Sequence, residues 1–170
     1  EFWSTQASSY LEWVSPWETV YESDFNKGEV SWFKGGKINA TVNCIDRHLE
    51  NKKNKTAIIW IGDDPKDSKK ISYKELHENV CKAANGLKEL GIKKGDRVAA
   101  YLPNIPETVI AYISTSVLGA VWSSCSPDFG TAGVIDRFSQ IDPKVLFVGD
   151  KYFYNGKKIN ILERLPEVLN

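Results

Sequence analysis

The chain has 170 residues, with 22 Lys plus Arg balanced by 22 Asp plus Glu. This length can bury one hydrophobic core, or it can form part of a larger domain. Zero net charge argues against nucleic acid as the main partner, because phosphate backbones attract a basic surplus. No apolar run approaches the length that spans a bilayer. We therefore expect a globular protein whose partners are neither nucleic acids nor membranes.

The first residues have neither the basic start nor the apolar stretch of a signal peptide, and the sequence contains no Met. We therefore expect a segment of a longer protein. The three cysteines, Cys44, Cys81 and Cys125, are too few and too irregular for a disulfide framework. A reducing, cytoplasmic setting fits them best.

The first 38 residues contain four of the six Trp. Residues 1–14 are expected to form a short helix that ends before Pro16. Residues 18–38 show no clean period, so we expect an irregular, aromatic-rich N-terminal arm whose Trp side chains need covering. Residues 39–51 are expected to form one helix, with Val42 and Ile45 on the same face.

Beyond residue 55, short apolar runs alternate with helical patterns. Strands are expected at 56–61, 97–102, 121–125 and 144–148, and helices at 73–90, 107–118, 132–141 and from 162. The charged residues 66–70 are expected to form a solvated loop. The helical boundaries are marked by a Ser72–Glu75 capping box, by Gly91 and by Pro106. This alternation is typical of parallel βαβ units, so the predicted fold class is α/β with a mostly parallel sheet.

Residues 122–130 (WSSCSPDFG) lie between an expected strand and an expected helix. In open parallel sheets, ligands bind beyond the carboxyl ends of the strands. The Ser, Asp and Gly of this segment could therefore meet a ligand. The segment could equally be a helix-entry loop in which Asp128 or Thr131 caps the helix. The pattern leaves both interpretations open.

The dipeptide Asn155-Gly156 predicts a tight turn, and Lys157 and Lys158 follow it. These cations could contact a phosphate group. The pattern alone favours a surface turn with solvated lysines.

Two pairs of potential metal ligands, Cys44 with His48 and His77 with Cys81, are each spaced four residues apart. Zinc favours these ligand types, so a non-enzymatic, zinc-stapled binding module is an alternative. Small buried cysteines are the commoner explanation, and we expect no metal site.

Several segments together resemble one family. Residues 43–49, 62–64 and 71–76 (NCIDRHL, GDD and ISYKEL) resemble acetyl-CoA synthetases, and residues 94–98 (KGDRV) resemble adenylate-forming ligases in general. Acetoacetyl-CoA synthetases are more similar at residues 101–107, 122–130, 136–141 and 154–157 (YLPNIPE, WSSCSPDFG, DRFSQI and YNGK). The resemblance covers nearly the whole chain. It implies a lead-in segment of acetyl-CoA synthetase type at 1–50 and the first subdomain of the AMP-binding (adenylate-forming) large domain at 51–170.

The resemblance also implies an activity for the full-length protein. A carboxylate attacks ATP to give an acyl-adenylate and diphosphate, and the CoA thiol then displaces AMP. ATP, CoA and Mg²⁺ are the implied cofactors, with Mg²⁺ balancing the phosphate charge. Acetoacetate is the favoured acid and acetate the alternative. The family's catalytic residues lie outside this segment, so no catalytic residue is assigned here. Without the remainder of its own chain, the segment is expected to be inactive.

A CoA contact is implied at Tyr154, Gly156 and Lys157. In acetyl-CoA synthetases a turn of pattern Arg-x-Gly-Arg lies near the 3′-phosphate of CoA. Here Gly156 keeps the turn and Lys157 keeps the charge, whereas Tyr154 departs from the pattern and could stack on adenine. Pro127-Asp128 replaces a glycine pair of that family, so Asp128 could face the pantetheine tunnel or cap a helix.

Overall fold

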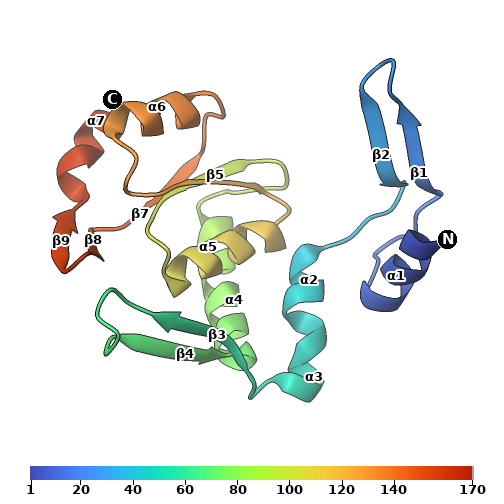
Figure 1. Cartoon of the computed structure of the whole chain (residues 1–170), viewed down its shortest axis with the longest axis horizontal. Coiled ribbons are helices and arrows are strands. Elements are labelled where there is room, and N and C mark those ends of the chain that lie inside the picture. The colour runs from blue at the N-terminus through green and yellow to red at the C-terminus, as the bar shows by residue number, and fades with distance from the viewer. Residues whose placement is uncertain (170) are drawn as a thin grey trace. The chain divides into compact units, whose positions relative to one another are not determined.

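The computed structural model describes residues 1–169 and shows two compact units. The first comprises residues 1–47, and the second begins at His48 (Figure 1). The fold class is α/β, as predicted, and its parallel sheet lies in the second unit.

The first unit contains a helix and a hairpin. Helix α1 (Phe2–Tyr10) is followed by the antiparallel strands β1 (Thr19–Asp24) and β2 (Glu29–Lys34). The prediction of an irregular arm at 18–38 is therefore wrong. The aromatic side chains that blurred the period pack on one another: ring contacts join Trp13, Trp17 and Phe33, and another series joins Trp3, Trp32 and Tyr21.

The stretch 39–51 is not one helix. The structure divides it into α2 (Ala40–Cys44), a 3₁₀ turn (Asp46–His48) and α3 (Leu49–Lys52). Ile45 causes the break, because its φ of −127° and ψ of −62° lie outside helical values while its side chain is buried. The predicted helix is therefore interrupted at Ile45.

The second unit begins with a hairpin that the sequence predicted only in part. Strand β3 (Thr56–Ile61) lies where expected, but it pairs antiparallel with β4 (Ser68–Ser72) and does not join the parallel sheet. The prediction of a solvated loop at 66–70 is wrong for its last three residues. Lys69 and Lys70 are exposed there, as is common on edge strands.

The helix boundaries follow the predicted signals. Ser72 and Glu75 form the capping box of α4 (Tyr73–Glu89), and Gly91 adopts a φ of +82° just after the helix. Pro106 occupies the first turn of α5 (Pro106–Val117).

Three parallel strands form the centre of the second unit, in the order β6-β5-β7. Helix α5 connects the first two of these strands along the chain, and α6 (Thr131–Ser139) connects the second to the third. The strands are β5 (Arg97–Tyr101), β6 (Val121–Cys125) and β7 (Val145–Val148). All three match the predicted positions.

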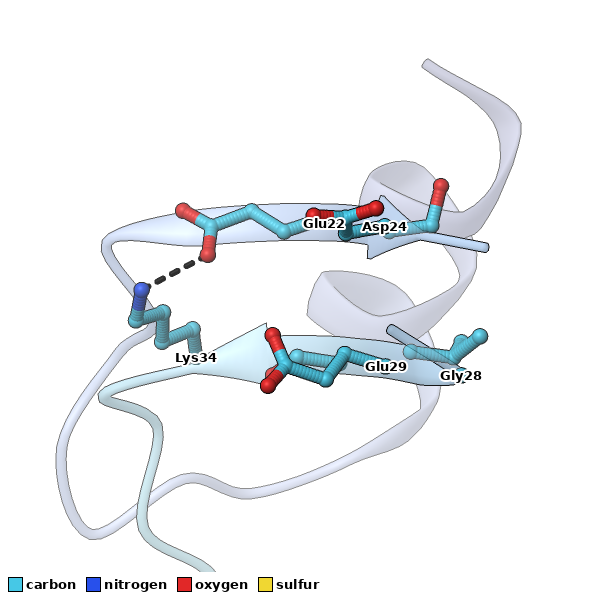
Figure 2. Close-up of a pocket in the computed structure, with 8 residues that line it drawn as sticks. Glu22, Asp24, Gly28, Glu29 and Lys34 are labelled. Carbon is cyan, nitrogen blue, oxygen red and sulfur yellow. Dashed lines mark hydrogen bonds and ion pairs between the residues drawn. The ribbon is translucent and has the colours of Figure 1, made fainter. Parts of the chain in front are cut away.

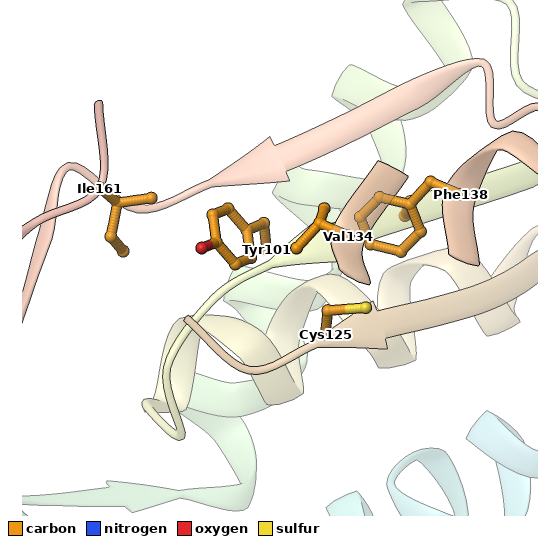
Figure 3. Packing of buried hydrophobic residues seen from close by; sticks show 6 residues of the cluster. Tyr101, Cys125, Val134, Phe138 and Ile161 are labelled. Atoms are coloured by element: carbon orange, nitrogen blue, oxygen red, sulfur yellow. The ribbon is translucent and has the colours of Figure 1, made fainter. Parts of the chain in front are cut away.

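Both faces of this sheet are covered, because successive side chains of β5 point to opposite sides. On one face, Val98 packs with Leu87 of α4 and with Ile92. On the other, Tyr101 joins a cluster with Cys125, Val134, Phe138 and Ile161 (Figure 3). This double burial explains why the β5 sequence is almost entirely apolar.

The chain continues into a second hairpin, of β8 (Lys151–Tyr154) and β9 (Lys157–Asn160). A 3₁₀ turn (Leu162–Arg164) and α7 (Leu165–Leu169) occupy the region where a helix was expected from residue 162.

Candidate coenzyme-binding edge

The carboxyl ends of β5, β6 and β7 lie at one edge of the sheet, because the strands are parallel. The segments that leave this edge are 102–105, 126–130 and 149–150. Ligands of open α/β sheets bind at this edge. The predicted site residues are therefore expected to lie at this edge.

Tyr101, a fully buried residue at the end of β5, anchors the loop 126–130. The Tyr101 hydroxyl lies 2.9 Å from the carbonyl oxygen of Phe129 and 3.2 Å from that of Pro127. Arg164 donates from Nη1 to the same Pro127 carbonyl (3.2 Å) and to the Tyr101 hydroxyl (3.4 Å). Its hydrogen bond to Tyr101 raises the pKa of Arg164, so this residue stays cationic.

Asp128 is held by two hydroxyl groups. Ser126 Oγ donates to Asp128 Oδ2, and Tyr152 Oη donates to Asp128 Oδ1, each at 3.0 Å. Burial, followed by the hydrogen bond to Asp128, raises the pKa of Tyr152, which therefore keeps its proton. Asp128 does not cap the next helix: the N-cap of α6 is Gly130, without a side-chain hydrogen bond. The capping alternatives for Asp128 and Thr131 are thus wrong.

The loop is also packed on its sides. The Arg137 guanidinium lies 4.3 Å from the centre of the Phe129 ring, a cation–π distance. Cys125 precedes the loop and is buried, and burial raises the pKa of its thiol. The thiol therefore stays protonated at neutral pH and belongs to the core (Figure 3).

The predicted turn at Asn155-Gly156 joins β8 to β9. Both residues have positive φ, +50° and +72°, as a type I′ hairpin turn requires. Tyr154 and Lys157 are directly paired across the hairpin. Both are exposed, so the structure confirms the predicted surface turn.

The hairpin brings the predicted residues toward one another. Alternation places Tyr152, Tyr154 and Lys157 on one face of it, with Tyr152 opposite Ile159. Because Tyr152 contacts Asp128, this face is the one turned toward the loop 126–130. Asp128 and the turn residues thus belong to the same edge, although no direct contact joins Asp128 to Tyr154 or Lys157 among the described residues.

The β3–β4 hairpin reaches this edge as well. Trp60 donates from Nε1 to the carbonyl oxygen of Asn104 (2.9 Å), in the segment that follows β5. Asp63, at the tip of the β3–β4 hairpin, accepts hydrogen bonds from the backbone N–H groups of Asn155 and Gly156. In the sequence, residues 62–64 were notable only for their resemblance to acetyl-CoA synthetases, which did not indicate this contact.

The alternative of a zinc site lacks a ligand cluster. Within residues 1–169, no three His, Cys, Asp or Glu side chains come together in a way that could hold a metal ion. Cys81 Sγ lies 3.5 Å from His77 Nε2 on α4. Contrary to the expectation of buried cysteines, Cys44 and Cys81 are exposed, and all three cysteines are free.

A shallow hollow lies elsewhere, on the β1–β2 hairpin (Figure 2). Lys34 Nζ donates to Glu22 Oε2 across it at 2.6 Å, and this hydrogen bond raises the pKa of Lys34. The hollow contains none of the predicted site residues; its lining is Glu22, Ser23, Asp24, Gly28, Glu29, Val30, Ser31 and Lys34.

Comparison with known families accounts for nearly all of the sequence. The model of the AMP-binding enzyme family matches residues 45–169, and the model of the acetyl-coenzyme A synthetase N-terminus matches residues 1–44. The chain belongs to the AMP-binding enzyme family. In the part that the structure describes, no helix is both long and apolar enough to cross a membrane.

Relatives in this family are similar over almost the whole chain. An acetyl-coenzyme A synthetase of Alkalilimnicola ehrlichii is 43% identical over 176 aligned residues, covering 99% of this chain and 27% of that protein. An acetyl-coenzyme A synthetase of Saccharophagus degradans is 47% identical over 158 residues, covering 93% of this chain and 24% of that protein. The solved structure of the acetoacetyl-CoA synthetase from Streptomyces lividans is 32% identical, with a TM-score of 0.90, covering 98% of this chain and 26% of that one. The chain thus spans about a quarter of the length of these relatives.

Proposed function

We propose that this chain forms the N-terminal part of an ATP-dependent ligase that joins a short-chain carboxylate to CoA. The proposal is supported by the family match over residues 45–169 together with the sheet edge that gathers Asp128 and the β8–β9 turn. Residues 1–50 would be the lead-in segment, and residues 51–170 the first part of the AMP-binding domain. The setting we propose is cytoplasmic, which suits three free cysteines.

The reaction proceeds in two steps. The carboxylate oxygen attacks the α-phosphorus of ATP, so that an acyl-adenylate forms and diphosphate leaves. The CoA thiol, losing its proton, then attacks the acyl carbon and AMP leaves. Mg²⁺ would offset the phosphate charge, and no ligand for it is proposed among residues 1–169, where no metal-holding cluster is present. These residues alone are expected to form no acyl-CoA.

Acetoacetate is the acid we propose. Residues 101–107, 122–130, 136–141 and 154–157 resemble acetoacetyl-CoA synthetases, and the Streptomyces lividans enzyme matches 98% of the chain in structure. Acetate is the second candidate, because relatives at 43% and 47% identity are named acetyl-coenzyme A synthetases.

Within this chain, the β8–β9 turn is the proposed CoA contact. Lys157 would face the 3′-phosphate, Tyr154 would stack on adenine, and Gly156 would allow the close turn. The exposed positions of Tyr154 and Lys157 on one hairpin face suit both roles. Asp128 would lie beside the pantetheine arm, although its carboxylate is already hydrogen-bonded by Ser126 and Tyr152.

The test is diphosphate release by the intact protein with ATP, Mg²⁺, CoA and either acetoacetate or acetate. Release with acetoacetate well above acetate supports the proposed acid. Release with acetate alone supports the proposed ligase activity but shows that acetate, not acetoacetate, is the acid. No release with any short-chain acid contradicts the proposed function itself.

A further inference from the structure

The tip of the β8–β9 hairpin is held by a carboxylate from a distant part of the sequence. Asp63 Oδ1 accepts a hydrogen bond from the N–H of Asn155 (2.9 Å), and Asp63 Oδ2 accepts one from the N–H of Gly156 (2.7 Å). The two residues of the turn are the ones with positive φ. Asp63 thus binds the turn through both of its oxygens.

Successive backbone N–H groups in a turn form a small concavity that binds anions. Here the anion is an internal carboxylate. A phosphate group arriving at this turn finds both amides already occupied, so its contact must come from side chains. Lys157 and Lys158 follow directly, and within residues 1–169 neither forms an ion pair.

The hairpin itself has little else to fix its tip. Each strand has four residues, and Phe153 and Tyr154 are exposed. Tyr152 anchors the base of the hairpin through Asp128. In the part of the chain that the structure describes, the hydrogen bonds that join the tip to residues outside the hairpin are the two that Asp63 accepts. A short, exposed hairpin without them would sample other orientations.

We propose that Asp63 is a positioning residue for CoA binding: by fixing the Asn155–Gly156 turn, it holds Lys157 where the 3′-phosphate is bound. This inference rests on the proposed function, since it requires CoA at the turn. In this role Asp63 would act on CoA through the turn, without contacting the reacting atoms. Its effect is to remove, before CoA arrives, the conformational freedom that binding would otherwise have to remove.

The sign of the effect separates this role from a simple charge effect. As a nearby negative charge, Asp63 would repel the phosphate, and its removal would lower the KM for CoA. As a positioning residue, its removal frees the turn and raises the KM for CoA. The two explanations therefore predict opposite changes from the same substitution.

The experiment uses the intact ligase and compares CoA with dephospho-CoA, which lacks the 3′-phosphate. For Asp63→Ala we expect the KM for CoA to rise about fivefold, equivalent to about 1 kcal/mol, with the KM for ATP unchanged. The KM for dephospho-CoA should rise less, because dephospho-CoA has no 3′-phosphate for Lys157 to bind and shares only the adenine contact of Tyr154 with CoA. Asp63→Asn keeps one acceptor and should show a smaller rise; it also carries the test if Asp63→Ala does not fold.

Asp64→Asn is the matched control. Asp64 lies in the same turn and accepts a hydrogen bond from the N–H of Lys66, so this variant removes one negative charge without touching the β8–β9 hairpin. It should leave the KM for CoA unchanged. The positioning role is overturned if the KM for CoA falls in both Asp63→Ala and Asp64→Asn. It is also overturned if Asp63→Ala raises the KM values for CoA and dephospho-CoA equally.

Lys157→Ala separates this inference from the proposed function. If Lys157→Ala reduces the preference for CoA over dephospho-CoA while Asp63→Ala does not, the CoA site stands and the positioning role is overturned. If Lys157→Ala leaves that preference unchanged, the phosphate contact at the turn is contradicted, and the positioning role falls with it.

Discussion

The parallel sheet and the two hairpins beside it are stabilised in different ways. In the sheet, Val98 to Tyr101 are all 0% exposed, and apolar side chains cover both faces. In the hairpins, Ile59 is 65% exposed and Tyr154 is 64% exposed. The sheet is thus fixed by burial on both faces, whereas the hairpins are less buried and hydrogen bonds contribute more to their placement.

This difference matters because the hairpins contribute to the proposed CoA-binding edge. The hydrogen bonds that help to place them join Trp60 to Asn104, Tyr152 to Asp128, and Asp63 to the β8–β9 turn. Loss of one such hydrogen bond typically costs less stability than truncation of a core side chain. We therefore expect substitutions in the sheet to act on stability and substitutions at the hairpin contacts to act mainly on ligand binding.

The largest expected effect is in the core. Leu87→Ala should lower the free energy of unfolding by about 2–5 kcal/mol, because it removes a buried side chain that packs with Val98 and leaves a cavity. Ile59→Ala, on the exposed side of β3, should cost less than about 0.5 kcal/mol. Denaturant unfolding of the intact protein measures both. Equal losses would contradict the contrast between sheet and hairpin.

Tyr101→Phe tests the junction between the two regions. The ring stays in the core, but the carbonyl of Phe129 loses a hydrogen-bond donor and Arg164 loses an acceptor. We expect a loss of about 1.5 kcal/mol in the free energy of unfolding. Tyr112→Phe, at an exposed tyrosine of α5, should be close to neutral. A neutral Tyr101→Phe would show that the loop 126–130 does not depend on this hydroxyl.

The same contrast explains how much the sequence could predict. Strands β5, β6 and β7 were predictable because an apolar run between turn signals is what double burial requires. The Ser72–Glu75 capping box and the Asn155-Gly156 turn were predictable because their residue types suit one local geometry. All of these signals lie within a few residues of the feature they indicate.

The missed features lack such local signals. Strand β4 was interpreted as a loop because Lys69 and Lys70 are charged, although charges are common on edge strands. In β1 and β2, aromatic residues face both sides of the hairpin, so no clean alternation appears. Asp63 and Arg164 contact segments far away in the sequence, and pairings of this kind leave no periodic pattern.

A smaller effect is expected at the start of α4, the helix that follows the β3–β4 hairpin and packs on the sheet. Ser72→Ala removes the hydroxyl that accepts a hydrogen bond from the Glu75 N–H. We expect a loss of about 1 kcal/mol in the free energy of unfolding. Ser68→Ala is the control, because Ser68 is exposed at the start of β4, the strand that ends at Ser72; this variant should be nearly neutral. If both variants unfold alike, the cap does not stabilise the helix.

The smallest effect is expected at the amino edge of the sheet and depends on pH. Hydrogen bonds from Lys144 and from the Lys93 N–H hold the pKa of Asp96 below its ordinary value of 3.8. Because the folded-state pKa is lowered, Asp96 stabilises the fold above that value, and the contribution is lost as pH falls through the folded-state pKa.

Asp96→Asn should therefore be less stable than the wild-type protein at neutral pH, and the difference should shrink below about pH 3.8. Asp142→Asn is the matched control: its side chain is 97% exposed and lies 3.7 Å from Arg97, so solvent screens the pair. Urea unfolding across this pH range measures the difference. If the stability difference between Asp96→Asn and the wild-type protein stays constant on acidification, the charge of Asp96 is not what stabilises the fold. Its shape and hydrogen bonds, which Asn shares in part, would then be responsible.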